Sequence, residues 1–267
     1  VFSVEATGAN ISYQWYRNNQ PVTGATLHEL TLYNVITADE GIYYVEVHGI
    51  CPVTPATSAT VVLTVNTAPN ITNQPTSRPA CEGNSTVFSV AATGTDLQYQ
   101  WRKDGVNISG ANSSQLTVND ITQADAGQYD VVITGACEPP ITSSRATLTV
   151  NTAPKITLEP LSQIVCEGET LQLTVEATGA GRTFQWRKDG VNIPAPEGIS
   201  QTYIVPNVTA AANGVYDVIV SGTCPPPDTS NAATISVQLP PQISGVPLFP
   251  VVQCPCESSC DTIVITN

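Results

Sequence analysis

Hydrophobic and polar residues alternate along short stretches of this chain, and glycine, asparagine, aspartate or proline separates one stretch from the next. Alternation with a period of two turns one face of a β-strand inward, and those four residue types favour turns. The 21 prolines and 18 glycines leave no window for a long amphipathic helix. Short strands with a turn signal roughly every 8–12 residues are typical of two packed antiparallel sheets. The pattern therefore predicts an all-β protein made of antiparallel sandwiches.

The same order of segments occurs three times along the chain. An aromatic residue, glutamine and tryptophan recur at a spacing of 86 and then 85 residues, ending at Trp15, Trp101 and Trp186. The phrase Trp-Arg-Lys-Asp-Gly-Val-Asn-Ile occurs at 101–108 and again at 186–193. Self-similarity at a fixed period indicates repeated structural units, so we expect tandem domains of one kind.

The junctions between these units are also repeated. Asn-Thr-Ala-Pro stands at 66–69 and at 151–154. Such junctions are too short to act as flexible tethers, so we expect neighbouring domains to touch end to end in a semi-rigid rod. The predicted domains are a first repeat that lacks its opening strand or strands, a second and a third repeat, and the start of a further β domain (1–66, 67–152, 153–238 and 239–267).

The conserved order of motifs resembles the immunoglobulin superfamily, and within it the intermediate, or I-type, set. In that resemblance the three tryptophans are the core residues of strand C, and Tyr43, Tyr129 and Tyr216 form the tyrosine corner at the start of strand F. The pattern Asp-x-Gly-x-Tyr is complete in the first two repeats. The third repeat has Ala212 in place of the aspartate, so we expect its corner to be held less firmly.

The usual disulfide between strands B and F is missing from this chain. Valine occupies both expected positions in each repeat: Val4 and Val45, Val90 and Val131, Val175 and Val218. The sandwich core is therefore expected to be apolar and independent of that bridge.

Cysteines stand instead at two other repeated places. Cys81 and Cys166 precede Glu-Gly before strand B, whereas Cys51, Cys137 and Cys224 fall in the turn between strands F and G. Repeated placement favours structural disulfides over chance thiols, and disulfides imply an oxidising compartment.

The pairing of these cysteines is a geometric question. In the immunoglobulin fold the A–B turn and the F–G turn lie at opposite poles, about 30 Å apart, whereas bridged Cα atoms lie within about 7 Å of each other. We therefore expect Cys81 to pair with Cys224 of the next repeat, with Cys137 and Cys166 pairing outside residues 1–267. The alternative, Cys81 with Cys137 and Cys166 with Cys224, stays open if the A–B segment runs differently.

Three further cysteines cluster near the end of the sequence, at Cys254, Cys256 and Cys260. Without a fourth cysteine or a histidine they fall short of a structural zinc set. Because Cys256-Glu257 aligns with Cys166-Glu167, we expect one of the three to play the repeat's role and the others to form disulfides.

Charge and composition exclude several functions. A formal net charge of −13, with nine scattered basic residues, argues against nucleic-acid binding. No stretch alternates aspartate and asparagine as a calcium loop does, and none is apolar for the roughly 18 residues that a membrane-spanning helix needs. The two histidines, His28 and His48, do not recur among the repeats, and no nucleophile elbow or phosphate loop is present. We therefore expect no enzyme, no cofactor and no metal.

The repeated phrase and the Cys-Glu-Gly and Gly-x-Cys motifs also resemble immunoglobulin-like repeats of large bacterial surface adhesins, most of all those of gliding bacteria with type IX secretion. That resemblance implies an extracellular, adhesive stalk or fibre. Its partners would be other domains of a long chain, and protein or glycan ligands or fibre subunits. Two alternatives stay open: a spacer region of a secreted hydrolase, and a eukaryotic immunoglobulin-type adhesion receptor. The receptor would use the six N-glycosylation sequons at Asn10, Asn70, Asn84, Asn107, Asn112 and Asn207.

Overall fold

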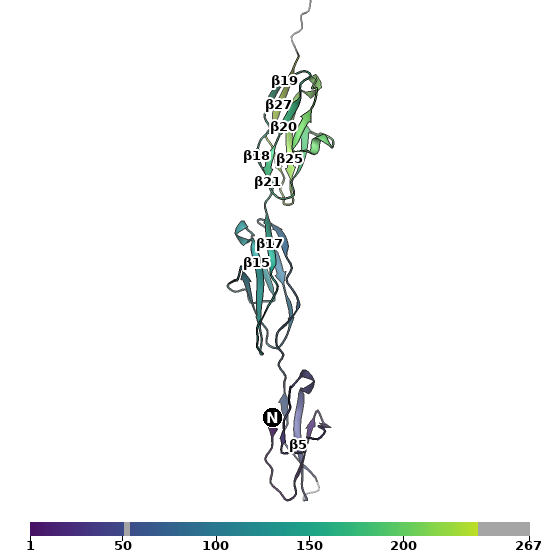
Figure 1. Ribbon diagram of the computed structural model, residues 1–267, viewed down its shortest axis with the longest axis vertical. Coiled ribbons are helices and arrows are strands. Elements are labelled where there is room, and N and C mark those ends of the chain that lie inside the picture. Colours follow the sequence, from purple (N-terminus) through teal and green to yellow (C-terminus); the bar gives the residue numbers. More distant parts are fainter. Residues whose placement is uncertain (51–53, 240–267) are drawn as a thin grey trace, which may run out of the picture. The chain divides into compact units, whose positions relative to one another are not determined.

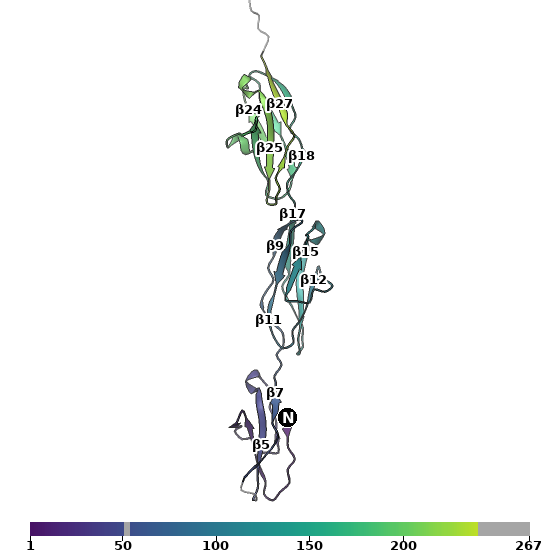
Figure 2. The ribbon, with the colours of Figure 1, turned by 180° about the vertical axis from the view of Figure 1, so that it is seen from behind.

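A computed structural model describes residues 1–50 and 54–239 (Figures 1 and 2). The described part consists of short strands and four 3-10 helices, without an α-helix, so the predicted all-β class is confirmed. By its contacts the chain divides into two units. One unit holds Val1–Ala153 together with Thr223–Pro225, and the other begins at Pro154. Cys51, Cys254, Cys256, Cys260 and the predicted further domain, apart from Leu239, lie outside the described residues.

The first repeat contains seven strands and one 3-10 helix: β1 (Phe2–Ser3), β2 (Ser12–Arg17), β3 (Gln20–Pro21), β4 (Glu29–Leu30), η1 (Thr37–Asp39), β5 (Gly41–His48), β6 (Ala56–Thr57) and β7 (Val61–Leu63). Its larger sheet has the order β3-β2-β5-β6 with β7 also on β5, and β1 pairs with β4.

The second repeat contains ten strands and one 3-10 helix: β8 (Asn70–Asn73), β9 (Arg78–Cys81), β10 (Thr86–Ser89), β11 (Ala91–Thr93), β12 (Gln98–Lys103), β13 (Val106–Asn107), β14 (Gln115–Val118), η2 (Gln123–Asp125), β15 (Gly127–Thr134), β16 (Ile141–Thr142) and β17 (Ala146–Asn151). One sheet has the order β13-β12-β15-β17-β9, and β8–β11 and β10–β14 pair opposite it. All of these pairs are antiparallel except β9 with β17, which is parallel.

The third repeat has the same plan: β18 (Lys155–Leu158), β19 (Gln163–Cys166), β20 (Leu171–Thr174), β21 (Glu176–Thr178), β22 (Thr183–Lys188), β23 (Val191–Asn192), η3 (Glu197–Ile199), β24 (Thr202–Val205), η4 (Ala210–Ala212), β25 (Gly214–Ser221), β26 (Asp228–Thr229) and β27 (Ala233–Gln238). Its main sheet has the order β19-β27-β25-β22-β23, with β19 again parallel to β27.

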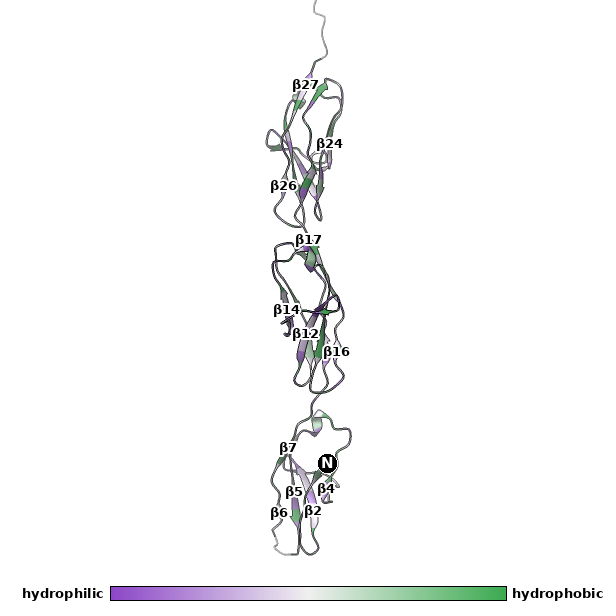
Figure 3. Cartoon of the chain, turned by 90° about the vertical axis from the view of Figure 1, so that its left-hand side faces the viewer, coloured by the Kyte–Doolittle hydropathy of each residue, from purple (hydrophilic) through white to green (hydrophobic). Residues whose placement is uncertain are grey.

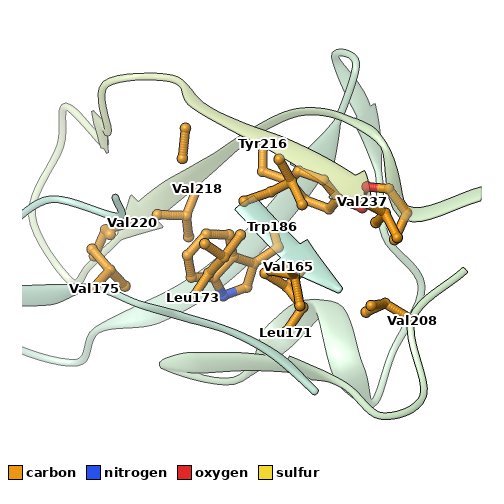
Figure 4. Close-up of a cluster of buried hydrophobic side chains, with 13 residues drawn as sticks. Val165, Leu171, Leu173, Val175, Trp186, Val208, Tyr216, Val218, Val220 and Val237 are labelled. Carbon is orange, nitrogen blue, oxygen red and sulfur yellow. Dashed lines mark hydrogen bonds between the residues drawn. The ribbon is translucent and has the colours of Figure 1, made fainter. Parts of the chain in front are cut away.

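Each repeat buries its own apolar core, supplied by alternate residues of its strands. Figure 3 shows hydrophobic and hydrophilic residues mixed along the strands, as the alternation requires. In the third repeat Trp186 lies among Leu173, Val218 and Tyr216 (Figure 4). Trp101 and Trp186 are fully buried, and Trp15 is 3% exposed.

In every repeat a turn residue with positive φ accepts a hydrogen bond from the start of strand F, which is β5, β15 or β25. Asn18, Asp104 and Asp189 have φ values of 49°, 50° and 50°. The side-chain Oδ1 of each accepts a hydrogen bond of 2.9 Å from the backbone N–H of Ile42, Gln128 and Val215, respectively. Asparagine and aspartate tolerate this left-handed conformation better than other non-glycine residues, which explains their use here.

Candidate functional site

The tyrosine corner is formed in all three repeats. The hydroxyls of Tyr43, Tyr129 and Tyr216 donate to the carbonyl oxygens four residues earlier, at 2.6, 2.8 and 2.9 Å. The expectation of a weaker corner in the third repeat is wrong for this bond. The acceptor is a main-chain carbonyl, which Ala212 supplies as well as an aspartate does.

The aspartate of the corner has another role, which the third repeat lacks. In the second repeat the Asp125 carboxylate accepts hydrogen bonds from the backbone N–H and the hydroxyl of Thr122, both at 2.8 Å. The backbone bond, and after it the hydroxyl bond, lowers the pKa of Asp125. Burial raises the pKa of Tyr129 and of Tyr216 to about 12, so both phenols stay protonated and keep donating at neutral pH.

Valine fills the positions where the family usually has its core disulfide. Val45, Val131, Val175 and Val218 are fully buried, Val90 is nearly so, and Val4 packs against the core of the first repeat. In the described residues the cores are therefore closed by apolar packing alone.

The repeated cysteines lie at the ends of the sandwiches. Cys81 is the last residue of β9 and pairs in register with Asn151, the last residue of β17. The structure joins Cys81 to Cys224 by a disulfide, with the two Cα atoms 5.6 Å apart. Cys224 Sγ also lies 3.6 Å from the carbonyl oxygen of Asn151. The alternative bond from Cys81 to Cys137 is not formed.

Residues 223–225, which include Cys224, belong to the first unit by their contacts. Cys224 is only 1% exposed, although it stands in a turn of the third repeat. Cys137 and Cys166 are free thiols in the described part of the chain, the first half-buried and the second exposed.

Two glycines that sequence reasoning missed fix the F–G turns. A Cβ on Gly222 would lie 2.9 Å from the carbonyl oxygen of Ala180 and 3.2 Å from the ring of Pro154. A Cβ on Gly135 would meet Thr95 and Pro69 in the same way, at 2.8 and 3.1 Å. Only glycine allows this close approach without displacing a backbone. The signal in the sequence is the Gly-x-Cys motif of each repeat, in which the glycine recurs together with the cysteine.

The other residues considered from sequence do not converge on a site. The side chains of His28 and His48 are 65% and 47% exposed, and their nearest carboxylates are those of Glu29 and Glu46, at 3.9 and 3.6 Å. Within residues 1–50 and 54–239, no three or more histidine, cysteine, aspartate or glutamate side chains are placed to hold a metal ion. The same part of the chain contains no helix long and apolar enough to span a membrane.

The family is decided by comparison with known proteins. The model of the immunoglobulin domain matches residues 68–134 and 153–221, which together are half of the chain. The chain belongs to the immunoglobulin-domain family. The matched regions contain the tryptophan strand and the tyrosine corner of the second and third repeats. Since this is a non-enzymatic fold, the segment is a non-catalytic tandem immunoglobulin region, as predicted.

Several long animal proteins are similar to this chain. Muscle M-line assembly protein unc-89 of Caenorhabditis elegans is 25% identical over 89% of this chain. Mouse protein sidekick-1 is 30% identical over 66% of it, and human hemicentin-1 is 28% identical over 72%. The chain spans only 3%, 9% and 4% of the lengths of these relatives.

Solved structures show the same fold. An I-band fragment of titin superimposes with a TM-score of 0.56 at 19% identity, covering 86% of this chain and 89% of that one. Sidekick-1 immunoglobulin domains 1–5 give a TM-score of 0.51 at 22% identity, covering 85% of this chain and 54% of that one. At these identities the likeness concerns the fold alone.

Proposed function

We propose that this chain is an extracellular stalk or fibre segment of a surface adhesin, in which the joint between repeats is secured by a disulfide. The observation that carries the proposal is the placement of the cysteines. They are absent from the core positions that the family normally bridges and occur at the ends of the domains, where Cys81 bonds to Cys224. A segment whose task is to keep a distal region at a distance gains more from a fixed joint than from a reinforced core.

The junctions support the same role. Asn-Thr-Ala-Pro leaves a linker of only three residues, 152–154, between β17 and β18, because β17 ends at Asn151 and β18 begins at Lys155. A spacer with such short connections resists bending better than one with a flexible linker.

More specifically, we propose a bacterial adhesin with type IX secretion. This part of the proposal rests on the repeated Trp-Arg-Lys-Asp-Gly-Val-Asn-Ile phrase and the cysteine motifs. A catalytic domain elsewhere in the full-length sequence would instead indicate the spacer of a secreted hydrolase.

The second candidate is a eukaryotic adhesion receptor, which two observations favour. The similar proteins named above are animal proteins. The asparagines of all six sequons are exposed, so each is accessible to glycan transfer. Secretion from mammalian cells followed by intact-mass analysis, with and without a glycosidase, tests it: native protein that carries glycan at several sequons favours the receptor.

Solution scattering tests the stalk. The oxidised chain is expected to give an elongated pair-distance distribution that broadens in the Cys81→Ser/Cys224→Ser variant, while the Cys137→Ser/Cys166→Ser variant stays unchanged. A collapsed, globular distribution for the oxidised chain would contradict the proposal. Non-reducing peptide mapping of the same sample establishes the bond: a peptide that joins Cys81 to Cys137 would remove the joint disulfide from the proposal.

A further inference from the structure

The Cys81–Cys224 bond changes the covalent path along which tension travels. Its two cysteines are 143 residues apart in sequence, so residues 82–223 form a closed loop beside the shortest covalent path. We propose that this bond is a force bypass, which conducts tension from the second repeat directly to the end of the third and keeps most of both repeats out of the path. The inference rests on the proposed stalk function, in which the chain is pulled from its two ends.

The load path follows from the order of the strands. Tension that enters the second repeat runs along β8 and β9 and reaches Cys81 at the end of β9. It crosses the disulfide to Cys224 and leaves along β27. Strands β10 to β17 of the second repeat and β18 to β25 of the third lie inside the loop. This path depends only on covalent connectivity and is the same for any arrangement of the two units.

Without the bond the path is different. Tension that enters at β9 must leave the second repeat through β17, and these two strands are held side by side by a parallel ladder of four residue pairs. The ladder of the third repeat, β19 with β27, also has four pairs. Each ladder would then carry the full load in shear through hydrogen bonds. With the bond in place, that load passes through covalent bonds between β9 and β27.

The bypass also limits extension. If both repeats unfold with the bond intact, the loop cannot lengthen the chain. At about 3.5 Å for each extended residue, 143 residues withhold about 500 Å of contour length. Reduction by dithiothreitol releases this length: the reagent's two thiols are oxidised to a ring disulfide, and Cys81 and Cys224 each gain a proton and an electron as thiols.

Single-molecule force spectroscopy of the whole chain, pulled by handles at its two ends, tests the bypass. Oxidised wild-type chain should show a total contour-length gain about 500 Å smaller than either the reduced chain or the Cys81→Ser/Cys224→Ser variant. The Cys137→Ser/Cys166→Ser variant should match wild type in both redox states. The double variant must show unfolding events for all three repeats, which separates loss of the bypass from loss of folding.

Two results would overturn the bypass. Equal total extension of the oxidised chain and of the Cys81→Ser/Cys224→Ser variant would show that the bond does not carry the load. Two separate reductions in extension of about 200 Å each would show bonds within the repeats instead, since Cys81–Cys137 and Cys166–Cys224 enclose shorter loops. Neither result contradicts the stalk function. The scattering experiment tests that function separately, because it measures shape without tension.

Discussion

The second and third repeats have the same architecture but fill the same core position in opposite ways. In the second repeat Phe88 of β10 faces Leu116 of β14, and in the third Leu173 of β20 faces Tyr203 of β24. The aromatic ring has moved across the strand pair. It still packs against the corner tyrosine, with ring centroids 4.9 Å apart for Phe88–Tyr129 and 5.8 Å apart for Tyr203–Tyr216.

This difference shows that the fold requires a certain total side-chain volume beside the tryptophan and the tyrosine. Either strand of the pair can supply the larger side chain. Cores tolerate hydrophobic exchange when volume and pattern are kept. Each repeat contains a single tryptophan. No second residue of this type therefore compensates for its loss.

The largest effect is therefore expected at the tryptophans. Trp101→Ala and Trp186→Ala should each lower the free energy of unfolding of their own repeat by about 3–5 kcal/mol, because both side chains are fully buried. Hydrogen exchange followed by mass spectrometry, peptide by peptide, measures each repeat separately. Equal loss of protection in both repeats from one substitution would show that they unfold as one unit.

An exchange of the aromatic pair tests the comparison directly. In the third repeat Leu173→Phe and Tyr203→Leu should each destabilise by about 1–3 kcal/mol, one through overpacking and the other through a cavity and a lost aromatic contact. The double variant recreates the pair of the second repeat and should recover most of that loss. Urea unfolding of the four proteins gives the coupling energy, and simple additivity of the two losses would contradict volume compensation.

The aspartate of the corner should matter in the first and second repeats, where Asp39 and Asp125 accept a backbone hydrogen bond, and not in the third. Asp125→Ala removes the acceptor for Thr122 and should cost about 1 kcal/mol, as loss of a helix cap does. Because its folded pKa is lowered, this contribution is present above the unfolded value of 3.8 and is lost as pH falls through the folded pKa. Hydrogen exchange measured at acid pH should show that the second repeat loses this contribution to its stability. The third repeat, with Ala212 there, serves as the control.

The smallest effect is expected on the outer face of the sheet. Asp130 lies 2.7 Å from Arg102 Nε and 3.8 Å from Arg145 Nε, whereas Asp217 in the third repeat pairs with Arg187 and has Ala232 where the second repeat has Arg145. Arg145→Ala should lower stability by no more than about 0.5 kcal/mol, because its side chain is 67% exposed. A thermal shift measured at low and at high salt checks this, and a loss that persists at high salt would point to packing instead of charge.

Much of the fold could be predicted because its signals are local. The alternation, the Tyr-Gln-Trp phrase and the Asp-x-Gly-x-Tyr phrase each lie within a few residues, and they indicated the all-β class and the tandem organisation. The parallel pairing of β9 with β17 was not apparent, since it joins segments about 70 residues apart. The close approach of Gly222 to Ala180 and Pro154 was missed for the same reason. The corner of the third repeat keeps its tyrosine hydrogen bond because the acceptor is a main-chain oxygen, which substitution does not remove, but it lacks the hydrogen bonds that Asp125 accepts in the second.

The residue that locks strand F has a consequence for the chemical ageing of the protein. The first repeat uses Asn18 where the others use Asp104 and Asp189, and all three side chains offer the same Oδ1 to the strand. Deamidation of Asn18 to aspartate would therefore keep the hydrogen bond and only add a negative charge at an exposed turn. The second and third repeats already contain the aspartate that deamidation would produce at this position, and the same hydrogen bond holds strand F there.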